Sequence, residues 1–457
     1  MLLLAALVLI LNVTTALRVG EVSAIDEQYW IDHLHRGADF EIERAGAPIL
    51  QETVREKCER GMAPSVLQVE PVPPCEPGHL NPRKYGYWHG VNIAGKEPFY
   101  FFVTGPIARV FQATPLDLPP NDSLITWARL LGSAWALAGL YCILRIGELL
   151  AVHRRRLVVA CMFIVATPAL LHANTIVNPD TTALFAGAAM LLAALVWERT
   201  GQRRHLLLLG LAALVGSAFN EKNAIGVLLV LAYFGIRALS RRTSSAGNRE
   251  EGDDDAGRDA DVRTWRQYAM AGALLVVALY LANNGWDWLY GQLQAHVFTA
   301  PPAPDLSNNP IALLYGNRDA GFWDYFGLDT IFRMFPPFQD IAPPAERTHE
   351  LYLTLAKGAE YIAIGALLAV VLRDKLTSKL SMLGCATVAT LLIAPTLTVL
   401  RNQWVGGTFD EPVWRYGLGA LPALAIIIAS SVRTRFAQVA FTVFTALLYV
   451  SALYVLF

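Results

Sequence analysis

Adjacent carboxylates at positions 26 and 27 follow the first apolar run of the sequence directly. Asp26 and Glu27 open the segment Asp-Glu-Gln-Tyr-Trp. A carboxylate beside a reacting hydroxyl can act as a general base, whereas most charged side chains in proteins are simply solvated. The other polar clusters described below favour a chemical role, so both residues are candidate catalytic groups.

An aromatic segment with charges at its start is the second cluster. Lys96 and Glu97 stand directly before Pro98-Phe99-Tyr100, and His89 follows a tryptophan. Aromatic residues at a bilayer edge often form only an interfacial belt. Charges at that depth would also meet the headgroup of a lipid-linked substrate. We therefore expect an amphipathic or re-entrant segment over residues 97–113, and four candidate substrate-binding residues: His89, Lys96, Glu97 and Tyr100.

Two short links between apolar runs carry further polar residues. Asn178-Pro179-Asp180 suits the first turn of a helix for local reasons, and Lys222 suits a surface turn. The functional interpretation is that Asn178 and Asp180 line a substrate cavity. Lys222 would meet a phosphate as a point charge.

A late link adds Arg401, Arg415 and Tyr416. Both arginines lie at the ends of apolar runs, where snorkelling to the interface is the default interpretation. Together with Lys222 they could neutralise a departing phosphate while a carboxylate accepts the proton of an attacking hydroxyl. The set therefore fits displacement of a lipid phosphate at a sugar carbon.

Sequence patterns typical of metal sites, phosphate-binding loops, serine nucleophiles and nucleic-acid binding are absent. The histidines have no zinc spacing, so no metal site is predicted, although participation of a divalent cation stays open. Glycine-rich phosphate loops and the Gly-x-Ser-x-Gly motif are absent. The net charge of −1 offers no basic field for phosphate-backbone binding, which excludes nucleic acid as an expected partner.

The composition says which elements must position these groups. Of 457 residues, 54% are hydrophobic and only 16% are charged, whereas soluble domains carry roughly 25% charged residues. The mean hydropathy is +0.38. The chain is therefore predicted to be an all-α polytopic membrane protein.

Apolar runs of membrane-spanning length indicate about eleven transmembrane helices. The first lacks a basic leader and a cleavage site, so we interpret it as a retained helix. The runs are residues 1–17, 124–147, 157–175, 181–198, 205–220, 223–239, 269–286, 354–372, 380–400, 416–432 and 436–457.

Arginine and lysine clusters in alternate links predict the orientation, because short cytoplasmic links are enriched in them. The clusters begin at positions 153, 199, 237, 373 and 433. Residues 18–123 and 287–353 are then large extracytoplasmic loops of a single membrane domain over residues 1–457. Residues 240–266 form a charge-dense cytoplasmic segment predicted to be disordered.

The two cysteines of the first loop, Cys58 and Cys75, are predicted to form a disulfide in an oxidising compartment. The alternative is two unpaired thiols. Cysteines within the apolar runs are interpreted as small buried hydrophobic residues.

Taken along the chain, these motifs resemble the GT-C superfamily of polyprenyl-phosphate-sugar glycosyltransferases. The resemblance rests on the first helix followed by Asp-Glu, the Pro-aromatic-Tyr element, the Asn-Pro-Asp link, the later lysine and the Arg-Tyr-Gly before the tenth run. Relatives of this pattern include protein O-mannosyltransferases, aminoarabinose transferases and actinobacterial mannosyl- and arabinofuranosyltransferases.

The resemblance implies a bacterial plasma-membrane enzyme of cell-wall biogenesis. It implies a polyprenyl-phosphate-sugar donor, an extracytoplasmic glycan, lipid or protein acceptor, and a single inverting displacement. Asp26 would be the base with Glu27 beside it; Lys222, Arg401, Arg415 and Tyr416 would bind the donor phosphate. The family's His-Pro-Pro-x-Tyr element is replaced here by Lys96-Glu97-Pro98-Phe99-Tyr100, which leaves open what acts in place of the histidine.

Two other classes of protein compete with this interpretation. A transporter or flippase of lipid-linked solutes would place ionisable groups at the bilayer midplane, whereas here they lie near the ends of the runs. An inactive scaffold with the same fold is the other alternative.

Overall fold

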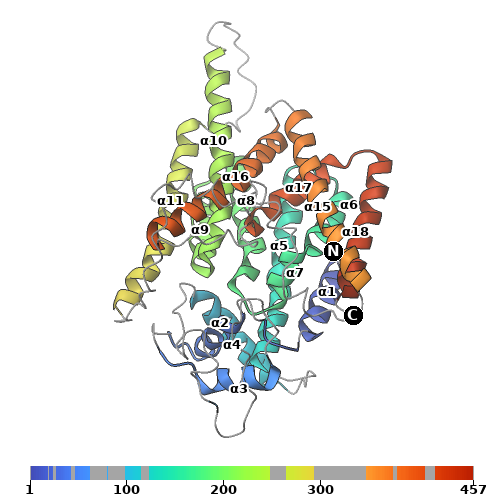
Figure 1. Cartoon of the computed structure of the whole chain (residues 1–457). Helices are drawn as coiled ribbons and strands as arrows, with labels where there is room; N and C mark the ends of the chain where they lie inside the picture. Colours follow the sequence, from blue (N-terminus) through green and yellow to red (C-terminus); the bar gives the residue numbers. More distant parts are fainter. Residues whose placement is uncertain are drawn as a thin grey trace.

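A computed structural model describes residues 2–18, 20–23, 27–42, 47–61, 80, 98–114, 123–247, 264–292, 346–373, 378–406 and 417–455. Within these ranges every regular element is a helix (Figure 1). The α-helices are α1 Leu2–Arg18, α2 Glu27–Ala38, α3 Gln51–Arg60, α4 Pro98–Gln112, α5 Leu124–Leu149, α6 Arg154–Val165, α7 Pro168–Thr175, α8 Ala183–Thr200, α9 Arg203–Phe219, α10 Ala224–Gly247, α11 Trp265–Gln292, α15 Glu346–Arg373, α16 Lys379–Gly406, α17 Leu421–Ser431 and α18 Arg435–Val455. Three short 3-10 turns precede α8, α10 and α17: η2 Pro179–Thr182, η3 Glu221–Asn223 and η5 Leu418–Ala420.

Six of the described helices are long and apolar enough to cross a membrane. The helices α6 and α7 make a seventh span if they count as one, although they are bent by 70°. The bend has a local cause, since Pro168 disfavours helical backbone in Thr167, which is extended. The expected count of eleven spans is not confirmed. Each predicted apolar run overlaps a described helix or helix pair, but several helices are short; α17, for example, has 11 residues.

One end of the bundle carries a cap made of α2, α3 and α4, seen below the long helices in Figure 1. The helices α2 and α4 cross with their backbones almost touching. A Cβ at Gly37 would lie 2.6 Å from Phe101 Cβ, and one at Gly105 would lie 2.6 Å from the Ala38 nitrogen. These glycines are therefore required by the crossing. We call this end of the bundle, defined by α2–α4 and the helix termini that contact them, the capped end.

The carboxylate of Asp32 joins α3 to α2. It accepts hydrogen bonds from Arg36 Nε (2.8 Å), the Leu50 backbone N–H (2.8 Å) and Thr53 Oγ1 (2.9 Å). Burial alone would raise the pKa of Asp32, but these bonds and the Arg36 charge hold it below its ordinary value. Asp32 is thus a structural group of the cap.

The opposite end of the bundle is held by one buried carboxylate. Glu198, near the end of α8, accepts hydrogen bonds from Tyr233 (2.8 Å) and Tyr268 (2.7 Å) and pairs with Arg237 and Lys379. These partners lie on α10, α11 and α16, so four helices meet at one charge. A buried charge is tolerated when it is paired and hydrogen-bonded in this way. We call this end of the bundle, defined by Glu198 and its partners on α10, α11 and α16, the basic end.

Close backbone contacts also fix the helix starts at the capped end. A Cβ at Gly132 on α5 would collide with the carbonyl oxygen of Asn174, and one at Gly187 on α8 would collide with that of Gly419 in η5. The helix α17, which follows η5, is buried on all sides over residues 421–430. The end of α7 and the turn before α17 are therefore placed by direct backbone packing, without intervening side chains.

Candidate active site

Two turns of the same construction begin α8 and α10 at the capped end. In η2 the Asn178 side chain accepts a hydrogen bond from the Asp180 N–H (2.9 Å), and in η3 Asn220 accepts one from the Lys222 N–H (2.9 Å). Asparagine suits this position because its side-chain oxygen caps an orphan N–H at a helix start. Each turn thus presents a charged residue two positions after its asparagine.

The two turns face each other, and their charged residues meet. Lys222 Nζ lies 3.4 Å from Asp180 Oδ1, to which the Asn220 amide also donates (2.5 Å). The Asp180 side chain is 2% exposed, whereas that of Lys222 is 23% exposed. The carboxylate is therefore an internal anchor, and Lys222 is the residue of the pair whose side chain solvent reaches.

A second cluster lies where α2 begins. Both Glu27 and Arg129 have fully buried side chains. Arg129 donates through Nε to Oε1 (2.7 Å) and through Nη2 to Oε2 (2.5 Å). The N–H groups of Ser23 and Val177 donate to the same carboxylate, each at 2.9 Å. These four hydrogen bonds fix Glu27, the residue immediately after position 26.

This carboxylate also connects the two clusters, because Val177 directly precedes Asn178. Tyr100 of α4 lies between them and is fully buried. Burial raises the pKa of the Tyr100 hydroxyl first, and the negative charges of Glu27 and Asp180 raise it further. Four residues predicted from separate parts of the sequence, Glu27, Tyr100, Asn178 and Asp180, are thus brought into one region.

Two arginines of this region were missed by the sequence analysis. Arg129 lies six residues into an apolar run, a position where a charge itself indicates a functional or paired group. Arg60, the last residue of α3, donates to Ser123 Oγ and Thr126 Oγ1, both at 2.5 Å. It lies near Arg129 and Glu27, whose charges both act on it. No sequence pattern indicated Arg60, which reaches the site through the fold of the cap.

Several predicted site residues lie outside the described ranges: Asp26, Cys75, His89, Lys96, Glu97, Arg415 and Tyr416. For Arg401 the structure describes the helix α16 but not the side chain. Cys58 is disulfide-bonded, while Cys142, Cys161 and Cys385 are free. The predicted pairing of Cys58 with Cys75 and the roles of the other residues stay predictions.

Within the described part of the chain, no group of three or more histidine, cysteine or acidic side chains could hold a metal ion. The clusters at the capped end instead combine buried carboxylates with guanidinium and ammonium groups. Groups of this kind are chemically suited to binding an anion and orienting a polar substrate. The fold and this site together define a helical, multi-pass membrane protein with a polar site at one end of the bundle.

Comparison with solved structures identifies the architecture as GT-C-like. The crystal structure of ArnT from Cupriavidus metallidurans bound to undecaprenyl phosphate superposes with a TM-score of 0.50 and 13% sequence identity, over 96% of this chain and 61% of ArnT. The apo state of ArnT superposes with a TM-score of 0.50 over 95% of this chain and 59% of ArnT. The chain thus spans about three fifths of the length of ArnT. No protein-family model and no curated protein matches the sequence.

Proposed function

We propose that this protein is a membrane glycosyltransferase that transfers a sugar from a polyprenyl-phosphate donor to an acceptor at the capped end. The observation that carries the proposal is the solvent-reachable Lys222 held beside the buried Asp180 in a GT-C-like bundle. A fixed cation at a membrane edge suits a lipid phosphate. ArnT, whose fold is similar, has been crystallised with undecaprenyl phosphate.

In this proposal the reaction is one inverting displacement. Asp26 accepts the proton of the acceptor hydroxyl as its oxygen attacks the anomeric carbon, and the bond from that carbon to the lipid phosphate breaks. Lys222, with Arg401, Arg415 and Tyr416, stabilises the charge on the departing phosphate. Lys222 has three donors, so it can bind phosphate without leaving Asp180.

Glu27 takes a different role from the catalytic one predicted beside Asp26. Its two oxygens already accept four hydrogen bonds, and no part of its side chain is exposed. A carboxylate so engaged is poorly suited to accept a proton from substrate. We propose that Glu27 and Arg129 are positioning residues that hold the backbone next to Asp26.

The remaining assignments follow from the same proposal. Asn178 and Asp180, with Tyr100, would line the sugar or acceptor pocket, together with His89, Lys96 and Glu97. The predicted basic clusters of the links would place the basic end in the cytoplasm and the capped end outside the plasma membrane. An extracytoplasmic glycan, lipid or protein would then be the acceptor.

Lys222→Gln should weaken donor binding while leaving the fold intact. Glutamine can still donate to Asp180 but carries no charge, and a charged hydrogen bond contributes about 1.5–3 kcal/mol, or roughly 10- to 100-fold in the donor Kd. The measurement is binding of an undecaprenyl-phosphate sugar to the full chain in nanodiscs, with release of undecaprenyl phosphate as the activity readout.

Lys357→Gln is the matched control, because Lys357 is an exposed lysine on α15. It should leave the donor Kd within about twofold of wild type. Equal binding by Lys222→Gln and wild type would remove the phosphate role from Lys222. If the protein moved the donor across the bilayer without releasing undecaprenyl phosphate, the result would favour a flippase over a transferase.

A further inference from the structure

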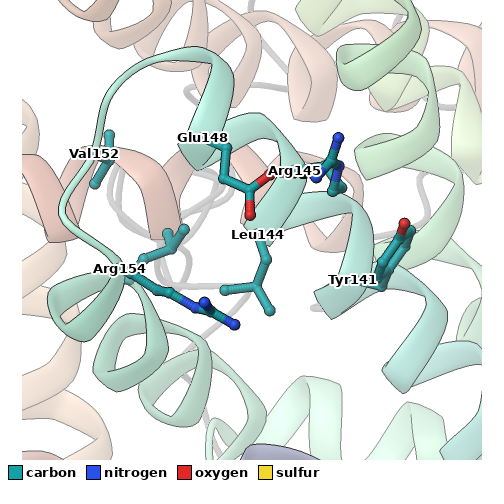
Figure 2. A pocket seen from close by; sticks show the side chains of 7 residues that line it. Tyr141, Leu144, Arg145, Glu148, Val152 and Arg154 are labelled. Carbon is teal, nitrogen blue, oxygen red and sulfur yellow. Dashed lines mark hydrogen bonds and ion pairs between the residues drawn. The ribbon is translucent and has the colours of Figure 1, made fainter. Parts of the chain in front are cut away.

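A small pocket at the basic end is separate from the candidate active site. Its volume is about 100 Å³, and it lies between the last turns of α5, the link to α6 and the first turn of α6 (Figure 2). Arg129 and Arg145 are both on α5, and the 16 helical steps from one to the other span roughly 24 Å. The pocket therefore does not belong to the site at the capped end. Its lining residues are Tyr141, Leu144, Arg145, Glu148, Val152, Arg154 and Leu157.

The charged lining of the pocket is asymmetric. Arg145 pairs with Glu148 at 2.5 Å, and both side chains are 54% exposed. Arg154 reaches toward the pocket from the opposite wall, as Figure 2 shows. Two guanidinium groups face one carboxylate, so the lining carries a net positive charge.

The surroundings of Arg154 strengthen the preference for an anion. The first turn of α6 contains Arg154, Arg155 and Arg156 and no acidic residue, and its N-cap His153 makes no side-chain capping bond. Basic side chains oppose the positive end of the helix macrodipole, where anions are favoured. An anion in the pocket would relieve this repulsion in addition to binding the guanidinium groups.

The apolar part of the lining distinguishes a lipid from a dissolved anion. Leu144 and Leu157 are buried at the pocket, while Tyr141 is 57% exposed on the outer surface of α5, one turn nearer the bundle centre than Arg145. Tyrosine is enriched at the headgroup level of bilayers. A headgroup bound by the arginines would continue along this face into the acyl region.

We propose that this pocket binds the phosphate headgroup of an anionic phospholipid in the leaflet at the basic end. Its volume suits a headgroup and is well below the 300–1,000 Å³ of sites for drug-sized ligands. Basic pockets between transmembrane helices are a recognised mode of anionic-lipid recognition, and this pocket lies between α5 and α6. The site requires no catalytic activity and would stand if the transferase proposal failed.

Binding of phosphatidylglycerol to the full chain in detergent, followed by native mass spectrometry, tests the site. Arg154→Gln should weaken binding about three- to tenfold, because an exposed charge pair contributes less than a buried one. Arg155→Gln removes the same charge from the same turn without lining the pocket, and should change binding by less than about twofold. If Arg154→Gln and Arg155→Gln lost phosphatidylglycerol binding equally, the proposed site would be wrong, and binding would depend only on the general surface charge.

Glu148→Gln provides a test in the opposite direction. It removes the carboxylate that competes for Arg145, so phosphatidylglycerol should bind about two- to threefold more tightly. Tighter lipid binding cannot result from misfolding of the variant. Unchanged or weaker binding in Glu148→Gln would contradict the proposed role of Arg145.

Two further ligands identify what the pocket recognises. Phosphatidylcholine, which has no net charge, should bind at least about threefold more weakly than phosphatidylglycerol, and the difference should vanish in Arg154→Gln. Glycerol phosphate, which has no acyl chains, should compete poorly. Full competition by glycerol phosphate would overturn the lipid assignment in favour of a soluble anion, and equal binding of the two lipids would overturn recognition of charge.

Discussion

Asp26→Asn should reduce sugar transfer by roughly 10²- to 10⁴-fold, the usual contribution of a general base. Asparagine has nearly the same shape as aspartate but cannot accept the proton of the acceptor hydroxyl. Donor binding should be unchanged, because the phosphate is assigned to Lys222 and the outer arginines. The measurement is the rate at which the full chain in nanodiscs releases undecaprenyl phosphate from a labelled sugar donor.

The matched control for this variant is Asp39→Asn. Asp39 follows α2, is 61% exposed and pairs with Arg109 at 3.2 Å, so it is an aspartate of the same cap without a place in the site. Its substitution should leave the rate within about twofold. Activity of Asp26→Asn within a few-fold of wild type would refute the assignment of the base.

Arg129→Met should destabilise the protein by about 3–5 kcal/mol, the usual cost of removing one partner of a buried ion pair. The variant leaves Glu27 fully buried with its charge uncompensated. The free energy of unfolding, measured by denaturant titration in a fixed detergent, checks this value. A loss below about 1 kcal/mol would show that the pair does not hold the cap.

A double variant separates loss of the pair from loss of packing. With Glu27→Met and Arg129→Met combined, neither charge stays buried alone, so the cost should be much smaller than that of Arg129→Met.

Arg129→Lys should restore part of the stability, since it keeps the charge but not the two parallel hydrogen bonds. If Arg129 positions the base, Arg129→Lys should also lower kcat with little change in the donor KM.

The same pair sets an expected dependence of stability on pH. Burial alone would raise the pKa of Glu27, but the charge and hydrogen bonds of Arg129, with the Ser23 and Val177 N–H groups, hold it below its ordinary value of 4.5. A carboxyl with a lowered folded-state pKa stabilises the fold above its unfolded pKa, and this contribution is lost as the pH falls through the folded value. The wild type should therefore lose more stability than the double variant as the pH is lowered below 4.5. Parallel pH profiles would contradict the assignment.

Linear patterns in the sequence predicted the helical class and the approximate position of each apolar helix. They also indicated the capped turn at Asn178 and Asp180 and the charge at Lys222, because a cap and the charge after it are properties of three or four consecutive residues, while the binding roles of these residues stay predictions. The predicted ends of the helices are less exact: α10 continues to Gly247, beyond the predicted run 223–239 and into the segment 240–266 that was predicted to be disordered. Arg237 and Lys379, from two of the predicted basic clusters, meet at Glu198. The span count of eleven was not confirmed, because hydropathy does not reveal that Pro168 bends one run or that α17 has only 11 residues.

Tertiary structure alone decided which of these groups meet. Glu27 and Arg129 are 102 residues apart, and their pairing depends on how the cap crosses the start of α5. The approach of the end of α7 to α5 depends on Gly132, where any side chain would collide with Asn174. The sequence by itself therefore determined which residues carry charge beside the membrane. The fold decided that Glu27 is an internal anchor and that Lys222 is reachable from solvent, because burial and pairing depend on neighbours that are distant along the chain.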